Sequence, residues 1–121
     1  MAVATFTTWA DTTEQTVLAA ACRVTAIEIA RHAEQANEVY LQLFDVANPT
    51  PGTTAPRMVL PVPTVAVAGG GNSPHIYKYI FPGGLRFGTA CTAFCSTTDD
   101  GATAPTTTSL PPRIRVFFAQ E

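Results

Sequence analysis

The spacing of proline and glycine between residues 37 and 63 constrains the fold of this chain more than any other feature. Two compact apolar segments, Glu38–Val46 and Arg57–Val62, flank a connection made of Pro, Gly, Thr and Ala, and prolines bracket the second segment. Because proline fixes φ and lacks a backbone N–H, this spacing leaves no room for a long helix. The sequence therefore predicts a strand, a long surface loop and a short strand.

The composition favours a β-protein that packs against other proteins. Only 13% of the 121 residues are charged, against roughly 25% in an average globular domain. Threonine and alanine are the two commonest residue types, and there are 10 prolines and 8 glycines, a mixture typical of many short strands joined by irregular loops. Interface cores are depleted in charge, so this composition suits a protein that assembles. An ordinary β-domain with a threonine-coated surface is the alternative interpretation.

Nucleic acid and membrane partners are not expected from the charge and hydropathy pattern. The net charge of −2 argues against nucleic acid, whose binding proteins concentrate positive charge on one face. No apolar segment reaches the length of about 18 residues that a membrane span needs. The N-terminal segment Met1–Gln15 lacks the basic start and apolar centre of a signal peptide, so synthesis in the cytoplasm is expected.

Several further segments alternate or are rich in β-branched residues, and each is bounded by turn residues. Seven or eight short strands at this spacing predict one all-β domain over residues 1–121, an antiparallel two-sheet β-sandwich that is jelly-roll-like with long loops. Residues 1–20 either form an N-terminal arm or pair within the domain. Pro82-Gly83-Gly84 is predicted as a turn that leads through Leu85–Gly88 into the next strand. The strands expected besides the two above are Thr5–Trp9, Arg23–Arg31, His75–Phe81, Thr89–Thr97 and Arg113–Gln120.

Two local alternatives stay open at this point. Thr12-x-x-Gln15 matches a capping box, so a short helix is the alternative to an extended entry there. Ala26–Ala36 is either helical, because its last part HAEQA contains good helix formers, or it ends in a hairpin loop over Ala33–Asn37. In the second case Glu38–Val46 runs back antiparallel to Arg23–Arg31, with apolar residues on both faces as in a central strand covered on both sides. The residues expected in the sandwich interior are Val39, Leu41, Leu43, Phe94, Ile114, Val116 and Phe118.

The three cysteines are expected to be reduced thiols of the core. Cys91 and Cys95 lie four residues apart on one predicted strand, about 13 Å from each other, and a disulfide needs Cα atoms within about 7 Å. A bridge from Cys22 to either of them is geometrically allowed but leaves one thiol over. Free cysteine is among the most buried residue types, so packing is the preferred role.

No catalytic, cofactor or metal site is expected from the motifs. Neither His32 nor His75 has a neighbour that makes a ligand pair or a catalytic dyad. Asp99-Asp100-Gly101 is a solvated turn, since calcium needs six to eight oxygen ligands at set spacing. Gly69-Gly70-Gly71 matches neither the dinucleotide fingerprint nor a P-loop.

The order of these segments resembles small structural proteins of tailed bacteriophages. The resemblance rests on YLQLFD (Tyr40–Asp45), a loop ending in Ala55-Pro56, MVLPVP (Met58–Pro63), Gly84-Leu85-Arg86-Phe87 and the aromatic last strand. Gly69–Pro74 and Asp99–Pro112 depart from that pattern.

The resemblance implies a capsid decoration (cement) protein on the outer surface of the virion head. Its partners would be the major capsid protein and further copies of itself, a dimer or trimer, with no cofactor. One alternative is a fibre or tail-tip module that binds a host-surface carbohydrate, for which Trp9, Tyr77 and Tyr79 are candidate contacts, although packing in the core or between subunits is their preferred role. Another alternative is an adaptor at the neck. Contact is expected through the termini and long loops, with the interface residues Phe6, Trp9, Pro49, Pro51, Asn72, Asp99 and Asp100.

Overall fold

The computed structural model describes residues 2–6, 15–31, 39–50, 53–62, 75–96 and 113–121, and these ranges contain strands and no helix. The expected all-β class is therefore confirmed. The strands are β1 (Ala2–Phe6), β2 (Gln15–Leu18), β3 (Cys22–Arg31), β4 (Val39–Phe44), β5 (Met58–Val62), β6 (His75–Phe87), β7 (Cys91–Ser96) and β8 (Arg113–Gln120).

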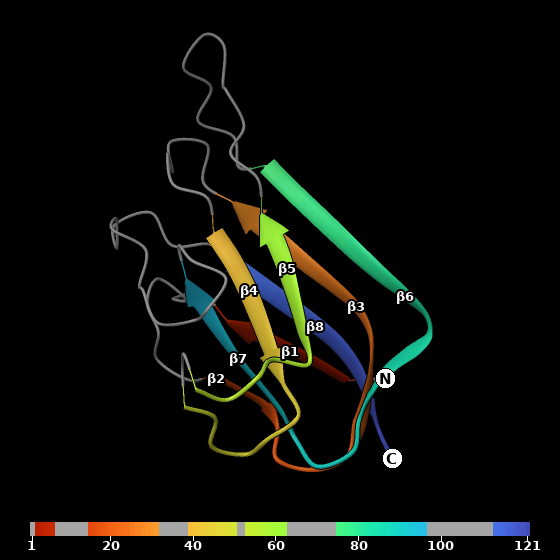
Figure 1. Cartoon of the computed structure of the whole chain (residues 1–121). Coiled ribbons are helices and arrows are strands. Elements are labelled where there is room, and N and C mark those ends of the chain that lie inside the picture. The colour runs from red at the N-terminus through yellow and green to blue at the C-terminus, as the bar shows by residue number, and fades with distance from the viewer. Residues whose placement is uncertain (1, 7–14, 32–38, 51–52, 63–74, 97–112) are drawn as a thin grey trace, which may run out of the picture.

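Two antiparallel sheets of four strands form the two layers of a β-sandwich (Figure 1). Sheet A has the order β1-β8-β3-β6, and sheet B has the order β2-β7-β4-β5. The chain passes from one sheet to the other after every strand except β4, which is followed by its own neighbour β5. The predicted two-sheet antiparallel sandwich is confirmed.

The strands pair as one long antiparallel ribbon folded at its middle. β4 pairs with β5, β3 with β6, β2 with β7, and β1 with β8. Two further pairings, β3 with β8 and β4 with β7, join neighbouring parts of the ribbon side by side into the two sheets. The ribbon therefore wraps around a single core.

The core lies between the sheets. It is formed by every second residue of the strands, whose side chains point inward. Ile27 and Ile29 of sheet A and Leu41 and Leu43 of sheet B belong to one fully buried cluster. β8 shows the predicted alternation, because Ile114, Val116 and Phe118 are buried while Arg115 and Ala119 are exposed. Of the seven residues expected in the interior, these five (Leu41, Leu43, Ile114, Val116 and Phe118) are confirmed, and the side chain of Val39 lies outside the described part.

Phe94 is buried, but on the other face of sheet B, so its expected place in the sandwich interior is wrong. It is paired in register with Gln42, and its ring meets Phe44 edge to face, with centroids 5.4 Å apart. Gln42, Phe44 and Thr92 are fully buried on this outer face as well. The prediction that Glu38–Val46 is covered on both sides is therefore confirmed.

Neither alternative left open for the region after Arg23 is correct: Ala26–Arg31 belongs to the strand β3 and not to a helix, and β3 forms no hairpin with Glu38–Val46. β3 is a central strand of sheet A, between β8 and β6, and β4 is a central strand of sheet B, between β7 and β5. The apolar faces of the two strands meet across the core instead of lying side by side. The connecting residues 32–38 are outside the described part.

The turn expected at Pro82-Gly83-Gly84 is also wrong, because β6 continues through it. Val24 pairs with Leu85 and Ala26 with Ile80, so the single residue Thr25 faces four residues of β6. Gly83 and Gly84 adopt positive φ angles of 78° and 84°, which glycine tolerates and which lets the chain form a wide bulge without reversing. The reversal comes later, at Gly88–Ala90, where the chain crosses to sheet B.

The N-terminal part of the chain contributes strands to both sheets. β1 pairs with β8 at one edge of sheet A, and β2 pairs with β7 at one edge of sheet B. At Gln15 the extended alternative is thus the correct one, and the chain from there to Leu18 is a strand. Residues 7–14, including Trp9, lie outside the described part.

Candidate interaction surface

The outer face of sheet A carries a row of apolar residues across all four strands. Val3 of β1 pairs with Phe117 of β8, Phe117 pairs with Ala26 of β3, and Ala26 pairs with Ile80 of β6. Residues that are paired in register project from the same face of a sheet. We call these four residues the apolar row.

A charged row lies two residues further along the same strands. Arg115 of β8 pairs with Glu28 of β3, which pairs with Lys78 of β6. The guanidinium Nη1 of Arg115 is 3.8 Å from Oε1 of Glu28, and Nζ of Lys78 is 6.0 Å from the ring centroid of Phe117. The signs alternate as plus, minus, plus across the sheet. Such exposed pairs stabilise a monomer only weakly.

Large apolar side chains on this face are exposed to an unusual degree. Ile80 is 67% exposed, Ile76 is 63% and Val3 is 51%, and the fourth exposed large apolar residue of the described part, Val46, lies in the loop after β4. Ile76 is on the same face as Ile80 and Lys78 because it follows the same alternation along β6. An apolar surface rimmed by charge is typical of a protein interaction site.

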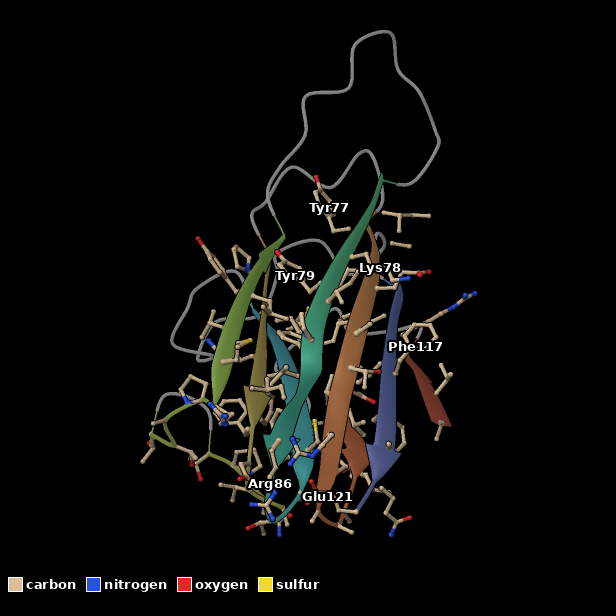
Figure 2. All side chains as sticks on the ribbon, turned by 90° about the vertical axis from the view of Figure 1, so that its right-hand side faces the viewer. Tyr77, Lys78, Tyr79, Arg86, Phe117 and Glu121 are labelled. Carbon is tan, nitrogen blue, oxygen red and sulfur yellow. The ribbon has the colours of Figure 1, made fainter. Side chains whose placement is uncertain are left out.

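A shallow hollow of about 250 Å³ lies in the apolar row, lined by Thr25, Ala26, Lys78, Ile80 and Phe117. The hollow lies beside the register shift between β3 and β6 at Thr25. The hydroxyl of Thr25 donates a hydrogen bond to the Phe117 carbonyl at 3.2 Å, which holds β3 and β8 together beneath the hollow. Figure 2 shows Lys78 and Phe117 on the same side of the sheet.

The two tyrosines of β6 point the other way, toward β5 (Figure 2). Tyr77 and Tyr79 pack against the core, and the Tyr79 hydroxyl donates a hydrogen bond to the Pro61 carbonyl of β5. Burial raises the pKa of Tyr79 above its ordinary value, and the neighbouring Tyr77 adds to this. Both tyrosines thus close the side of the sandwich where the edge strands β5 and β6 lie.

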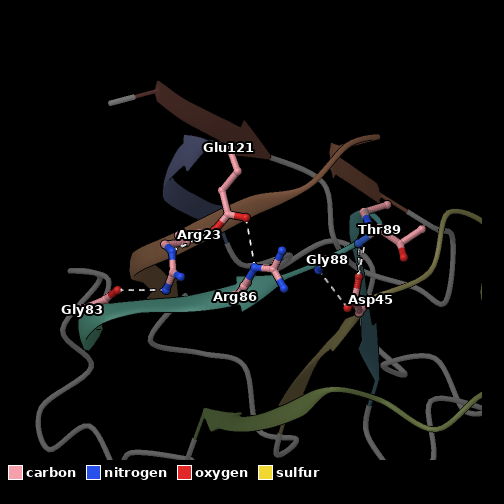
Figure 3. Close-up of polar contacts among 8 residues, drawn as sticks. Arg23, Asp45, Gly83, Arg86, Gly88, Thr89 and Glu121 are labelled. Carbon is pink, nitrogen blue, oxygen red and sulfur yellow. Dashed lines mark hydrogen bonds and ion pairs between the residues drawn. The ribbon is translucent and has the colours of Figure 1, made fainter.

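At one end of the outer face, Glu121 joins two arginines (Figure 3). Its Oε1 is 2.8 Å from Nε of Arg23, and its Oε2 is 3.0 Å from Nε of Arg86. Arg23 also donates to the carbonyl of Gly83 at 3.4 Å. This cluster neutralises part of the positive charge of the face and fixes β3 against the bulged strand β6.

Asp45, directly after β4, fastens the corner between β6 and β7 (Figure 3). Its carboxylate accepts backbone N–H bonds from Gly88 at 2.9 Å, Thr89 at 2.8 Å and Ala90 at 3.2 Å. Burial alone raises the pKa of Asp45, but the three N–H donors and the charge of Arg57 outweigh burial and hold the pKa below 3.8. Asp45 therefore has a structural role.

The cysteines are free and buried, as expected. Cys22 of sheet A and Cys91 of sheet B hydrogen-bond to each other across the core. Burial raises the pKa of Cys91, and the neighbouring Cys22 and Asp45 raise it further. Burial raises the pKa of Cys95 to about 12. The thiols are therefore protonated at neutral pH and poor nucleophiles, because the thiolate is the reactive form.

Most of the residues predicted to form the loop interface lie outside the described part of the chain. The backbone of Phe6 pairs with Ile114 at the end of β1, and Pro49 is buried in the loop after β4. These placements do not test whether Phe6 and Pro49 contact the shell or another copy, so their interface role stays a prediction. The others, Trp9, Pro51, Asn72, Asp99 and Asp100, lie outside the described residues.

The apolar row was not expected from the sequence. The alternation of Ile76, Lys78 and Ile80 was visible, and the lysine between two isoleucines was the signal that this face meets solvent. The sequence does not show the strand register. Only the register places Phe117, Ala26 and Val3, which come from three separate strands, in one row with Ile80.

Within the described residues, no group of three or more His, Cys, Asp and Glu side chains is placed to hold a metal ion. The same part of the chain has no helix long and apolar enough to cross a membrane. Comparison with family models, with curated proteins and with solved structures finds no match for this chain.

Proposed function

We propose that this protein is a structural component of a virion, a capsid decoration (cement) protein that binds the outer surface of a bacteriophage head and stabilises contacts between capsomers. The observation that carries the proposal is the outer face of sheet A, where Val3, Ile76 and Ile80 are more than half exposed. A face of this kind is costly to leave in water and favours a protein that works in an assembly.

The pairing of the strands supports a jelly roll, the fold that the proposed protein class commonly uses. A ribbon in which β1 pairs with β8, β2 with β7, β3 with β6 and β4 with β5 wraps into two four-stranded sheets. Such double sheets occur in viral capsid domains. The wrapped ribbon has one continuous core, which makes it a stiff unit for transmitting load.

The physical task of a cement protein fits such a unit. A shell filled with packaged nucleic acid is under pressure, and a protein that bridges neighbouring capsomers adds its binding free energy to their cohesion. Bridging needs at least two contact surfaces on a rigid body. The exposed face of sheet A supplies one, and the loops predicted to contact the shell, with the major capsid protein as partner, supply the other.

Addition of the purified protein to expanded heads that lack decoration tests the proposal. We expect saturable binding in stoichiometric numbers, hundreds of copies per head, and heads that withstand a higher temperature before they release their contents. A few copies per particle would indicate a neck component. The absence of binding to heads, together with binding to host-surface carbohydrate, would contradict the proposal and favour a fibre or tail-tip module.

A further inference from the structure

The outer face of sheet A is complementary to itself in both shape and charge. We propose that it binds a second copy of this chain around a twofold axis that lies in the plane of the face, parallel to the strands and between β8 and β3. Rotation about this axis places β8 opposite the partner's β3 and β1 opposite the partner's β6. This inference goes beyond the proposed function and does not depend on it.

Under this rotation the apolar row of one copy faces the apolar row of the other, with the order of its residues reversed. Phe117, a large side chain, comes to lie opposite Ala26 of the partner subunit, which lines the hollow. Val3 and Ile80, on the two edge strands, come to lie opposite each other, so both of these exposed side chains are covered. Large residues against small ones is the arrangement that packs two sheet faces without voids.

The charged rows of the two copies also face each other in reversed order, which brings opposite charges together. Arg115 comes to lie opposite the partner's Glu28, and Glu28 comes to lie opposite the partner's Arg115. In the single chain the two residues are 3.8 Å apart, with side chains 58% and 27% exposed. Between two copies each carboxylate would thus stand between two guanidinium groups, away from bulk water. Charge complementarity of this kind fixes the orientation of an interface.

A twofold axis along the apolar row is less favourable. It would place Phe117 against Phe117 of the partner subunit, and Lys78 near the partner's Arg86. Two large rings would then compete for one space, and two like charges would be brought together. Like charges that face each other across an interface oppose association strongly, so this alternative is disfavoured.

Pairing through the edge of β6 is disfavoured by the same kind of argument. The segment Ile76-Tyr77-Lys78-Tyr79-Ile80 reads the same in both directions, so an antiparallel pair centred on it would match apolar with apolar residues. The central position, however, would bring Lys78 against Lys78 of the partner subunit. A lysine in the middle of an edge strand and a bulge next to it are two common protections against edge pairing. The face, not the edge, therefore carries the contact.

The size of the face sets the expected strength. Four strands about 4.8 Å apart, with about 3.4 Å per residue along each, give a face of roughly 20 Å by 25 Å. Interfaces at this low end of the size range occur mainly in weak, transient complexes, and a dissociation constant on the order of 10 μM is therefore expected. The dimer should therefore form and dissociate with concentration.

Charge reversal gives a test that separates this geometry from general stickiness. Glu28→Arg and Arg115→Glu are made singly and together, and sedimentation equilibrium is measured for each protein from micromolar to several hundred micromolar. The unmodified chain should change from 12.8 kDa to twice that mass. Each single variant should dimerise at least about tenfold more weakly, because the rotation brings like charges together at two symmetric places. The double variant should dimerise again.

An equal mixture of the two single variants is the sharpest arm of this test. In the mixed dimer the arginine introduced at position 28 faces the glutamate introduced at position 115, and the native Arg115 faces the native Glu28. The mixture should therefore dimerise about as tightly as the unmodified chain, although each component alone dimerises at least about tenfold more weakly. This result does not depend on whether a single variant is somewhat less stable, and far-UV circular dichroism confirms that each one is folded.

Several outcomes would overturn the inference. An unmodified chain that stays monomeric at several hundred micromolar would do so, and so would single variants that dimerise as tightly as the parent or a mixture that dimerises no more tightly than its two components. If the chain is monomeric and both single variants fail to bind heads, the face docks on the shell, and the proposed function stands without the dimer. A dimer that passes this test but ignores heads would contradict the proposed function alone.

Discussion

The outer faces of the two sheets differ although both belong to the same wrapped ribbon. On sheet B the outward residues of the central strands, Gln42, Phe44, Thr92 and Phe94, are almost completely buried in the single chain. On sheet A the outward Ile76 and Ile80 are more than 60% exposed. The outer face of one sheet is therefore buried within the chain, whereas large apolar side chains of the other remain exposed, on the face where we propose that a partner binds.

The chemistry of the two faces explains the difference. The outward residues of β4 and β7 are aromatic or small and polar, without a charge among Gln42, Phe44, Thr92 and Phe94. The outward residues of sheet A alternate apolar rows with charged residues, which keep the face soluble before association. A face that mixes charge with apolar area can exist in both states, whereas an uncharged face with large aromatic side chains is more stable when it is covered in the folded chain.

The largest contrast is expected between Phe44→Ala and Ile80→Ala. Phe44 is fully buried against Phe94, so its truncation leaves a cavity and should lower the free energy of unfolding by about 3–5 kcal/mol. Ile80 is 67% exposed, so its truncation should change that free energy by no more than about 0.5 kcal/mol. Urea denaturation at 1 μM protein or so, where the dimer is dissociated, measures both. Similar losses for the two variants would contradict the difference between the faces.

Truncation on the inner face of sheet B should have an effect of comparable size. Leu41 lies in the sandwich core between Cys95 and Leu60 in register, and Leu41→Ala should cost about 2–5 kcal/mol through lost burial and a cavity. β4 would then need both of its faces for stability. A small loss, like that expected of Ile80→Ala, would show that the register of β4 is wrong.

Periodicity in the sequence was enough to predict the class, the sandwich and most inward residues. β8 alternates cleanly, and a period of two identifies its buried face without further information. Periodicity failed where a buried aromatic lies on the far side of a sheet, as for Phe94, because a strand covered on both faces has no polar side that marks its direction.

Neighbours in space were less predictable than the strands themselves. The hairpin alternative for β3 and β4 assumed that consecutive strands pair, but these two strands face each other across the core. Pro82-Gly83-Gly84 has the composition of a reversing turn, yet in this chain it forms a bulge in a strand that stays paired with β3 on both sides of it. The apolar row depends on these pairings, so it became visible only with the register.

A smaller effect is expected at the bulge beside the hollow in sheet A. At Gly84, with φ of +84°, an added Cβ would lie 3.0 Å from Cβ of Arg23, whereas Gly83, with φ of +78°, has open space around it. Gly83→Ala should cost about 1 kcal/mol through backbone strain alone, and Gly84→Ala about 2 kcal/mol because it also displaces Arg23. Urea denaturation of the two variants checks the order. If Gly83→Ala proves the more harmful, the bulge is placed incorrectly.

The smallest effect is a dependence of stability on acid through Asp45, at the corner between β6 and β7. Its pKa is lower in the folded chain than the ordinary 3.8, so its contribution to stability is present above that value and is lost as the pH falls through the folded pKa. Asp45→Asn should cost about 1 kcal/mol at neutral pH, discounted for partial exposure. Its stability should also fall less than that of the parent between pH 5 and pH 2 or so. If the free energy of unfolding of the two proteins depends on pH in the same way, Asp45 does not have this role.

Sedimentation of two aspartate variants tests most directly whether the outer face of sheet A is the association surface. Ile80→Asp places a charge in the apolar row, and Val46→Asp places the same charge at an exposed apolar residue outside that face. At a few hundred micromolar, we expect Ile80→Asp to stay at 12.8 kDa and Val46→Asp to dimerise like the unmodified chain. A dimer that survives Ile80→Asp, or that is lost with Val46→Asp, would contradict this assignment of the surface.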